Sequence, residues 1–274
     1  MRRARGGIGN PEGCGAECFL SPLAVDNDYF QSRLAGQQLE RRFDVMFSGR
    51  IVKLKNPLFF AEVCVGIKAR LGKCRVLIIG DGKNALKAEM RRIFEQHGVS
   101  CEFAGFIPQT ALPEYYSQSR LLLLPTSRDC WGVVLNEAMA AGTPAITTAW
   151  TAAAGELVLH ERNGYVLPLD VEAWASVASE LLSNQTKWEA LSQCAQQTVK
   201  EFSYDKAAAG ILSALAYLSG RQELAFQRPS QSKTSKTLKE TCGSCLRIFS
   251  PSRRSNGAEV PAVRRPQPDH RLGN

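Results

Sequence analysis

The sequence predicts an α/β fold in which helices cover both faces of a parallel sheet. Three observations lead to this prediction: six short apolar runs, helical spacing of apolar residues between them, and alternation of the two patterns through about 170 residues. Continuous apolar runs are typical of parallel strands that are buried on both faces. Strands and helices in alternation favour right-handed crossovers, and therefore a doubly wound parallel sheet.

The six predicted strands share one pattern, an apolar run that ends in Gly, Pro or polar residues. They are Val45–Ile51, Arg75–Gly82, Cys101–Ile107, Arg120–Thr126, Thr143–Trp150 and Asn163–Leu169. Each run has the length of a strand rather than of a helix, so we expect all six in the sheet.

The predicted helices have apolar residues at helical spacing or a high content of strong helix formers. They are Pro57–Leu71, Leu86–His97, Val133–Ala141, Val171–Leu182, Trp188–Phe202 and Lys206–Leu218. Asp170 precedes the fourth of these helices. We expect its carboxylate to cap that helix, because it can accept a hydrogen bond from a backbone N–H of the first turn.

Composition divides the chain into three parts. Residues 1–42 form an N-terminal segment with a Gly/Arg-rich start, residues 43–220 hold the alternating pattern, and residues 221–274 are rich in Ser, Thr, Lys, Arg and Pro. The last part has a net charge of +7, out of +8 for the whole chain, and its composition predicts a disordered basic tail. The folded part is therefore nearly neutral, and no nucleic acid partner is expected for it.

Several features predict a cytoplasmic protein. No apolar run has the length of a membrane span, and none near the N-terminus has the length of a signal peptide. Cys64, Cys74, Cys101 and Cys194 lie in apolar runs, as expected for reduced thiols. The basic tail predicts weak contact with anionic lipid at the inner face of the membrane. Its Cys242–Cys245 pair lacks a second pair at suitable spacing, so no metal site is expected.

Glycines and charged residues follow the first, second and fourth predicted strands. They are Gly49, Arg50 and Lys55; Gly80, Asp81 and Gly82; and Asp129, Cys130, Trp131 and Gly132. Ligands of an open parallel sheet bind beyond the carboxyl ends of its strands, so we expect these three groups at one edge.

This edge has the composition of a diphosphate site. A helix start preceded by Gly132 offers free backbone N–H groups and the positive end of the helix dipole. Arg50 and Lys55 can bind the same anion from the facing loop, and such a site needs no metal and no cofactor. Glu137, one turn into the helix, is placed to accept hydrogen bonds from a ribose, and Asp129 from another polyol.

Each signal also has a plainer interpretation. Arg50 and Lys55, taken singly, are more often solvated charges, and a lone Gly-Asp-Gly is a weak turn signal. An acid near a helix N-terminus usually does no more than favour the dipole, and Trp131 can simply pack. Convergence of all of them on one edge is what favours a ligand site.

Taken together, the motifs resemble the C-terminal, donor-binding half of GT-B glycosyltransferases, and in particular glycosyltransferase family 4. The resemblance covers roughly Phe43 to Tyr217 and has the family's motifs in order. These are DCWGVVLNEAMAAGTPAI (Asp129–Ile146), FSGR with a following Lys (Phe47–Lys55), GDG (Gly80–Gly82), FAGF (Phe103–Phe106) and AAGELV…NGYVLP (Ala153–Pro168). It implies a Rossmann-like domain and retaining transfer of a sugar from a nucleoside-diphosphate sugar to a hydroxyl.

The resemblance also implies roles for individual residues. Arg50 and Lys55 would hold the diphosphate and stabilise it as it leaves, and Glu137 would hold the ribose hydroxyls. Asp129 takes a sugar-contacting position where the family usually has Glu, so its reach is shorter. The other implied donor contacts are Gly49, Gly80, Asp81, Gly82, Phe106, Ile107, Trp131, Gly132 and Val133.

The family's fold has a second, acceptor-binding domain that the residues before Phe43 are too few to form. We therefore expect this chain to be a donor half, either a fragment or one part of a split enzyme with a separate acceptor-domain chain. The alternative is a nucleotide-sugar-binding module without turnover. The presence of Arg50, Lys55 and Glu137 favours the enzyme.

Overall fold

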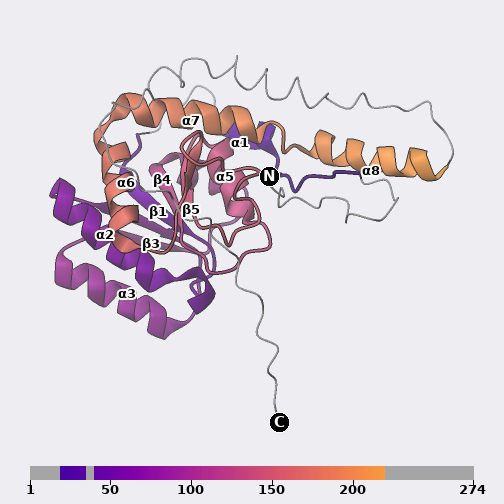
Figure 1. The fold of residues 1–274 in the computed structure, drawn as a ribbon. Helices are drawn as coiled ribbons and strands as arrows, with labels where there is room; N and C mark the ends of the chain where they lie inside the picture. Colours follow the sequence, from indigo (N-terminus) through magenta and orange to yellow (C-terminus); the bar gives the residue numbers. More distant parts are fainter. Residues whose placement is uncertain (1–18, 35–39, 220–274) are drawn as a thin grey trace, which may run out of the picture.

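The computed structural model describes residues 19–34 and 40–219. Its centre is a parallel sheet of six strands in the order β3-β2-β1-β4-β5-β6 (Figure 1). The strands are β1 (Phe43–Ser48), β2 (Arg75–Ile79), β3 (Ser100–Gly105), β4 (Ser119–Leu124), β5 (Ala145–Thr147) and β6 (Gly164–Val166). The order reverses direction between β1 and β4, which confirms the predicted doubly wound sheet.

Helices cover both faces of this sheet. They are α1 (Asn27–Leu34), α2 (Pro57–Leu71), α3 (Asn84–His97), α4 (Leu112–Ser117), α5 (Val133–Ala140), α6 (Val171–Ser183), α7 (Gln185–Val199) and α8 (Tyr204–Leu218). All six predicted helices are present. α1, α4 and a short 3₁₀ turn at Lys53–Lys55 were not predicted.

Successive strand residues bury their side chains in two separate cores. In β1, Val45 and Phe47 point into a core with α2, α3 and α6, whereas Met46 points into a core with α1, α4, α5 and α7. All six residues of β1 are buried, as expected for a central strand that is covered on both faces. The sheet therefore has no open face, and ligand access is left to its edges.

Local signals position several elements as expected. Asp170 Oδ1 accepts a hydrogen bond of 2.7 Å from the backbone N–H of Ala173, which confirms the predicted cap of α6. Three of the cysteines expected to be reduced, Cys64, Cys74 and Cys101, are free thiols, but Cys194 is disulfide-bonded, contrary to expectation. In the described part of the chain, no helix combines the length and the apolar character that crossing a membrane requires. The predicted tail and Cys242–Cys245 lie outside the described residues.

The last described helix, α8, extends away from the sheet (Figure 1). It has no buried residue, and its large apolar side chains are about half exposed or more. The segment that contains Phe19 and Ser21 runs along it: Ser21 Oγ donates to the carbonyl of Ala207 at 3.0 Å, and the Phe19 and Tyr217 rings are 5.5 Å apart. α8 thus presents an apolar surface that the described residues do not cover.

Candidate functional site

The site predicted from the sequence lies at the carboxyl edge of β1 and β4, where the strand order reverses. This is the position at which open α/β sheets leave a crevice for ligands. Lys55 follows β1, and Asp129 follows β4. Their side chains form an ion pair, and both are largely buried, with exposed fractions of 20% and 17%. Two residues separated by 74 positions in the sequence are thus joined across the switch point.

Loops after β1 and β2 are held unusually close to each other. A Cβ atom on Gly80 would lie 2.1 Å from the carbonyl oxygen of Gly49, and one on Gly82 would lie 2.2 Å from that of Ile51. Gly80 also has a φ of 112°, which L residues with side chains rarely adopt. The Gly-Asp-Gly motif is therefore required for close backbone packing. Its Asp81 is exposed, and its salt bridge with Lys87 and the Gly82 N–H lower its pKa.

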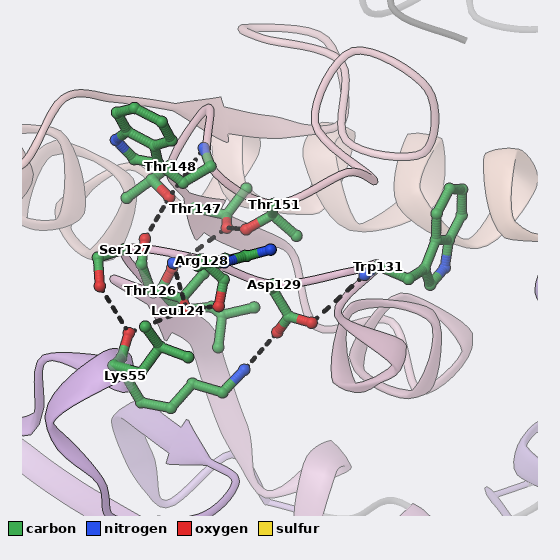
Figure 2. Close-up of polar contacts among 12 residues, drawn as sticks. Lys55, Leu124, Thr126, Ser127, Arg128, Asp129, Trp131, Thr147, Thr148 and Thr151 are labelled. Atoms are coloured by element: carbon green, nitrogen blue, oxygen red, sulfur yellow. Dashed lines mark hydrogen bonds and ion pairs between the residues drawn. The ribbon is translucent and has the colours of Figure 1, made fainter. Parts of the chain in front are cut away.

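Hydrogen bonds fix the loop after β4 on both sides (Figure 2). Thr126 Oγ1 donates to the Leu54 carbonyl at 3.1 Å, and the backbone N–H of Ser127 donates to the same carbonyl at 2.9 Å. Thr148 Oγ1 donates to the Thr126 carbonyl at 2.6 Å. These bonds join the loops after β1, β4 and β5 and thereby hold Asp129 in place. No role in the site was predicted from the sequence for any of these hydroxyl residues.

Asp129 lies between two donors. Lys55 approaches one carboxylate oxygen, and the backbone N–H of Trp131 donates to the other at 3.3 Å (Figure 2). The Trp131 indole points away from this pair: it donates to Asn136 Oδ1 at 2.8 Å and its ring lies 5.7 Å from that of Phe202. In this structure the Trp131 side chain packs, and what it offers to the edge is its backbone.

The start of α5 faces the same edge. Gly132 is the N-cap, with a φ of 90° and no side-chain cap. A Cβ there would lie 2.9 Å from Thr151 Cγ2, so both conformation and space require glycine. The backbone N–H groups of Val133 and Val134, in the first turn, have no partner within the helix. The sequence predicts that such a helix start binds an anion, and the geometry of α5 allows this.

Glu137 lies one turn further along α5 and is part of a buried chain of hydrogen bonds. Tyr116 Oη donates to Glu137 Oε2 at 2.6 Å and lies 2.7 Å from Ser48 Oγ. Burial raises the pKa of Glu137, while the hydrogen bond from Tyr116 acts to lower it. Burial and the neighbouring carboxylate also raise the pKa of Tyr116 well above its ordinary value. No role in the site was predicted for Tyr116, which lies outside the recognised motifs, or for Ser48, although Ser48 lies within the FSGR motif.

The remaining predicted residues lie around this centre. Arg50 is exposed and makes no ion pair or side-chain hydrogen bond with the described residues, so its guanidinium is available to a ligand. Phe106 is 81% exposed after β3, whereas Ile107 packs partly against the core. The site is therefore an open edge that includes the exposed Arg50, the ion-paired Lys55 and the start of α5.

The strand order and this glycine-lined, cationic edge define a doubly wound α/β domain. The family comparison is more specific: the chain belongs to the glycosyl transferases group 1 family, whose model matches residues 32–218.

Curated proteins with similar sequences are also named as glycosyltransferases. D-inositol 3-phosphate glycosyltransferases of Xylanimonas cellulosilytica and Mycobacteroides abscessus are 26% and 29% identical to this chain, over 65% and 69% of it. A 2-deoxystreptamine N-acetyl-D-glucosaminyltransferase of Niallia circulans is 28% identical over 59% of the chain. The matches cover 43%, 42% and 41% of these relatives, so the chain spans less than half of their length.

Solved structures share the fold. Anabaena Alr3699/HepE in complex with UDP and glucose has a TM-score of 0.57 at 18% identity, with 72% of this chain and 55% of that one covered. The C-terminal domain of a group 1 glycosyl transferase (LpcC) from Francisella tularensis has a TM-score of 0.53 at 19% identity, with 67% and 95% covered. At these identities the likeness concerns the fold.

Proposed function

We propose that this chain is the donor-binding half of a retaining, family 4 glycosyltransferase of the GT-B type, which transfers a sugar from a nucleoside-diphosphate sugar to a hydroxyl. The observation that supports this proposal most is the grouping of Lys55, Arg50 and the start of α5 at the switch point of the sheet. Coverage of 95% of a solved C-terminal domain agrees with the assignment as a donor half.

In this proposal the diphosphate binds between the start of α5 and the two cations. The exposed Arg50 guanidinium forms two parallel hydrogen bonds to the diphosphate, and the Lys55 ammonium group contributes a compact positive charge. As the bond to the sugar breaks, negative charge develops on the diphosphate, and groups already held in place stabilise it without reorganising. Asp129 keeps Lys55 in position and borders the sugar.

The nucleoside occupies the space next to Glu137. An ionised Glu137 accepts hydrogen bonds from the ribose hydroxyls, and the residues around Phe106 and Ile107 border the base. Gly49, Gly80, Gly82, Gly132 and Val133 contribute backbone to the donor site. UDP is the first nucleotide to test, because UDP is present in solved relatives such as Alr3699/HepE.

Calorimetric titration with UDP, GDP and ADP, with and without EDTA, tests the site. We expect binding in the presence of EDTA, and a loss of at least about tenfold in affinity for the Arg50→Ala, Lys55→Ala double variant, because charged hydrogen bonds contribute about 1.5–3 kcal/mol each. The matched control is Arg91→Ala, Arg92→Ala, which removes two cations from the outer surface of α3. Equal affinity in the double variant and the wild type would refute the assignment.

Lys55→Ala also leaves Asp129 without its cation, so folding must be checked separately. The thermal midpoint of each single variant serves this purpose. Arg50→Ala removes an exposed side chain without a partner among the described residues, and we expect its midpoint to be unchanged. Loss of UDP affinity in this variant alone is then a direct effect on binding.

The acceptor side of the cleft is proposed to come from a further domain, in the same polypeptide or in a separate chain. α8 offers a surface for it: Ile211, Leu212, Leu215 and Leu218 are all more than half exposed. The lengths of the curated relatives agree with a further domain, because more than half of each lies outside the match. Proposed locations are the cytoplasm and the inner face of the membrane.

A further inference from the structure

A cavity lies at the amino edge of the sheet, the edge opposite to the candidate donor site. It is a cavity of about 410 Å³ whose lining includes Arg41, Lys73, Arg75 and Arg120. These cations converge because the strands are parallel: Arg75 is the first residue of β2 and Arg120 the second of β4, on either side of Asp44 in β1. The strand length of five or six residues, about 17 Å, separates this cavity from the donor site.

Positive charge is in excess in this cavity. Asp44 is its one acidic lining residue, and Glu189 also acts on Arg120 from α7. Burial, followed by repulsion from Arg120, lowers the pKa of Arg41 to about 10. Burial also lowers the pKa of Arg120, with a further contribution from Arg75. The guanidinium groups are thus close enough to repel one another, and an added anion would relieve this repulsion.

Two of the cations have structural partners. Helices of a parallel α/β fold end at the amino edge of the sheet, where their last carbonyls attract positive charge. Arg41 donates to the carbonyls of Ala141 and Gly142 after α5, at 3.2 and 2.9 Å, and Arg120 donates to that of Leu182 in the last turn of α6, at 2.8 Å. Arg41 and Arg120 are therefore explained without a ligand.

Arg75 and Lys73 are not explained in this way. The Arg75 Nη2 atom lies 3.3 Å from Asp44, and its Nε atom is buried without a hydrogen-bond partner among the described residues. A buried donor without an acceptor costs free energy. Lys73 is exposed at the rim, where no described residue forms an ion pair with it. Among the described residues, Lys73 thus has no ion-pair partner and Arg75 is paired through Nη2 alone, whereas helix carbonyls accept hydrogen bonds from Arg41 and Arg120.

We propose that this cavity binds a phosphate-type oxyanion, with Arg75 and Lys73 as direct ligands and Arg41 and Arg120 as supporting charges. Arg75 supplies a planar guanidinium group and Lys73 an ammonium group on a flexible side chain, and both groups commonly bind phosphate. Trp188 does not provide a stacking platform for a base. It is 7% exposed, and the guanidinium carbons of Arg41 and Arg120 lie 4.7 and 5.2 Å from the centroid of its ring. The recognised group is therefore the oxyanion itself.

Calorimetry with inorganic pyrophosphate tests this proposal in the Arg50→Ala, Lys55→Ala background, which removes the two donor-site cations. We expect one site to remain, and the further changes Lys73→Gln and Arg75→Gln to weaken binding at least tenfold. Arg91→Gln, Arg92→Gln in the same background lowers the net charge equally on the surface of α3 and should leave the affinity unchanged. No binding in the background, or an unchanged affinity after Lys73→Gln and Arg75→Gln, would overturn the proposal.

Two additions complete this experiment. Lys73→Gln alone changes an exposed side chain and keeps the fold. It should weaken pyrophosphate binding severalfold. The proposal can therefore be tested even if Arg75→Gln causes a folding defect. Sedimentation with phosphatidylcholine vesicles, with and without phosphatidic acid, distinguishes the source of the phosphate. Pyrophosphate binding without sedimentation assigns a free phosphate compound. Sedimentation that requires phosphatidic acid and Lys73 assigns a lipid headgroup.

Discussion

Asp129 and Glu137 are both carboxylates of the candidate site, but their surroundings give them different properties. Asp129 is paired with Lys55 and also accepts a hydrogen bond from the backbone N–H of Trp131. Glu137 forms no ion pair with the described residues, and its one hydrogen bond to a described side chain comes from Tyr116. Burial raises its pKa, so folding destabilises the charged form that is proposed to bind ribose.

The Glu137→Gln variant is therefore expected to be more stable than the wild type but to bind UDP more weakly. A carboxyl group whose pKa is raised by folding stabilises the fold at low pH, and this contribution disappears as the pH rises through the folded-state pKa. Glutamine keeps an acceptor for Tyr116 and has no charge to bury. We expect a rise of about 2 °C in the thermal midpoint at pH 8, no rise at pH 4, and a loss of about tenfold or more in UDP affinity.

Glu156→Gln, on an exposed loop after β5, is the control and should change neither property. A lower midpoint for Glu137→Gln at pH 8, together with unchanged UDP affinity, would show that Glu137 is a structural residue. Tyr116→Phe adds a second check. It removes the hydrogen bond that lowers the pKa of Glu137, so this pKa should rise further. When the pH is lowered, UDP affinity should therefore begin to decline at a higher pH than in the wild type.

Single residues also mark the limit of sequence interpretation. Lys55 and Asp129 were predicted at one edge because each follows a strand of a parallel sheet, and in the structure they form an ion pair there. Ser48 and Tyr116 were missed, since the hydrogen bond between them spans 68 positions, and the FSGR motif that contains Ser48 does not indicate its partner. Their roles follow from burial next to Glu137, and burial of this kind depends on the assembled fold.

At the scale of elements, the closeness of the loops after β1 and β2 predicts unequal effects for two glycines. Gly80→Ala places a Cβ 2.1 Å from the backbone of Gly49 and also requires a positive φ. Gly72→Ala at the end of α2 requires a positive φ of 74° but has open space. Urea unfolding should show a loss of about 1–2 kcal/mol for Gly72→Ala.

For Gly80→Ala we expect at least about 2 kcal/mol more, because the backbone of one loop must move. UDP affinity should fall in Gly80→Ala only, since Arg50 follows directly on Gly49. Equal losses of stability for the two variants would mean that the loops can separate freely and that the motif has no packing role.

Which elements could be predicted depends on their length and pattern. α2 agrees residue for residue with its prediction, because Pro57 begins it and Gly72 ends it. α4 has six residues, too few to show a period. α1 has a weak apolar pattern, and Asn27 holds it in place through bonds of 3.0 and 3.2 Å to the carbonyls of Val199 and Phe202. Long-range contacts of this kind leave no local signal.

At the scale of the whole molecule, the proposed function assigns the described residues to the donor side of a cleft, and no described element forms the opposite side. The sheet is covered on both faces, while α8 and the segment near Phe19 leave apolar side chains exposed. The open edge with Lys55 has solvent on its outer side. Efficient sugar transfer requires that water is excluded and that the acceptor hydroxyl is oriented, and both need a second wall.

We therefore expect the purified chain to bind a nucleotide-sugar but not to transfer its sugar. Arg50, Lys55 and the start of α5 can still stabilise a leaving diphosphate, so slow hydrolysis, detected as release of UDP, is expected and should be lost in the Arg50→Ala, Lys55→Ala variant. A transfer assay with several nucleotide-sugars and with sugar and lipid acceptors measures the second reaction. A full-length curated relative, assayed in parallel, is the positive control.

The result of the transfer assay distinguishes two sources for the other side of the cleft, a further domain and a second copy of this chain. Absence of transfer, together with binding and slow hydrolysis, agrees with a donor half that needs a further domain on α8. Transfer at rates like those of the full-length control would contradict it. Leu212→Glu and Leu215→Glu then identify the cause, since both place a charge on the exposed surface of α8. If these changes abolish transfer and also reduce the mass in solution from dimer to monomer, a second copy of the chain supplies the wall.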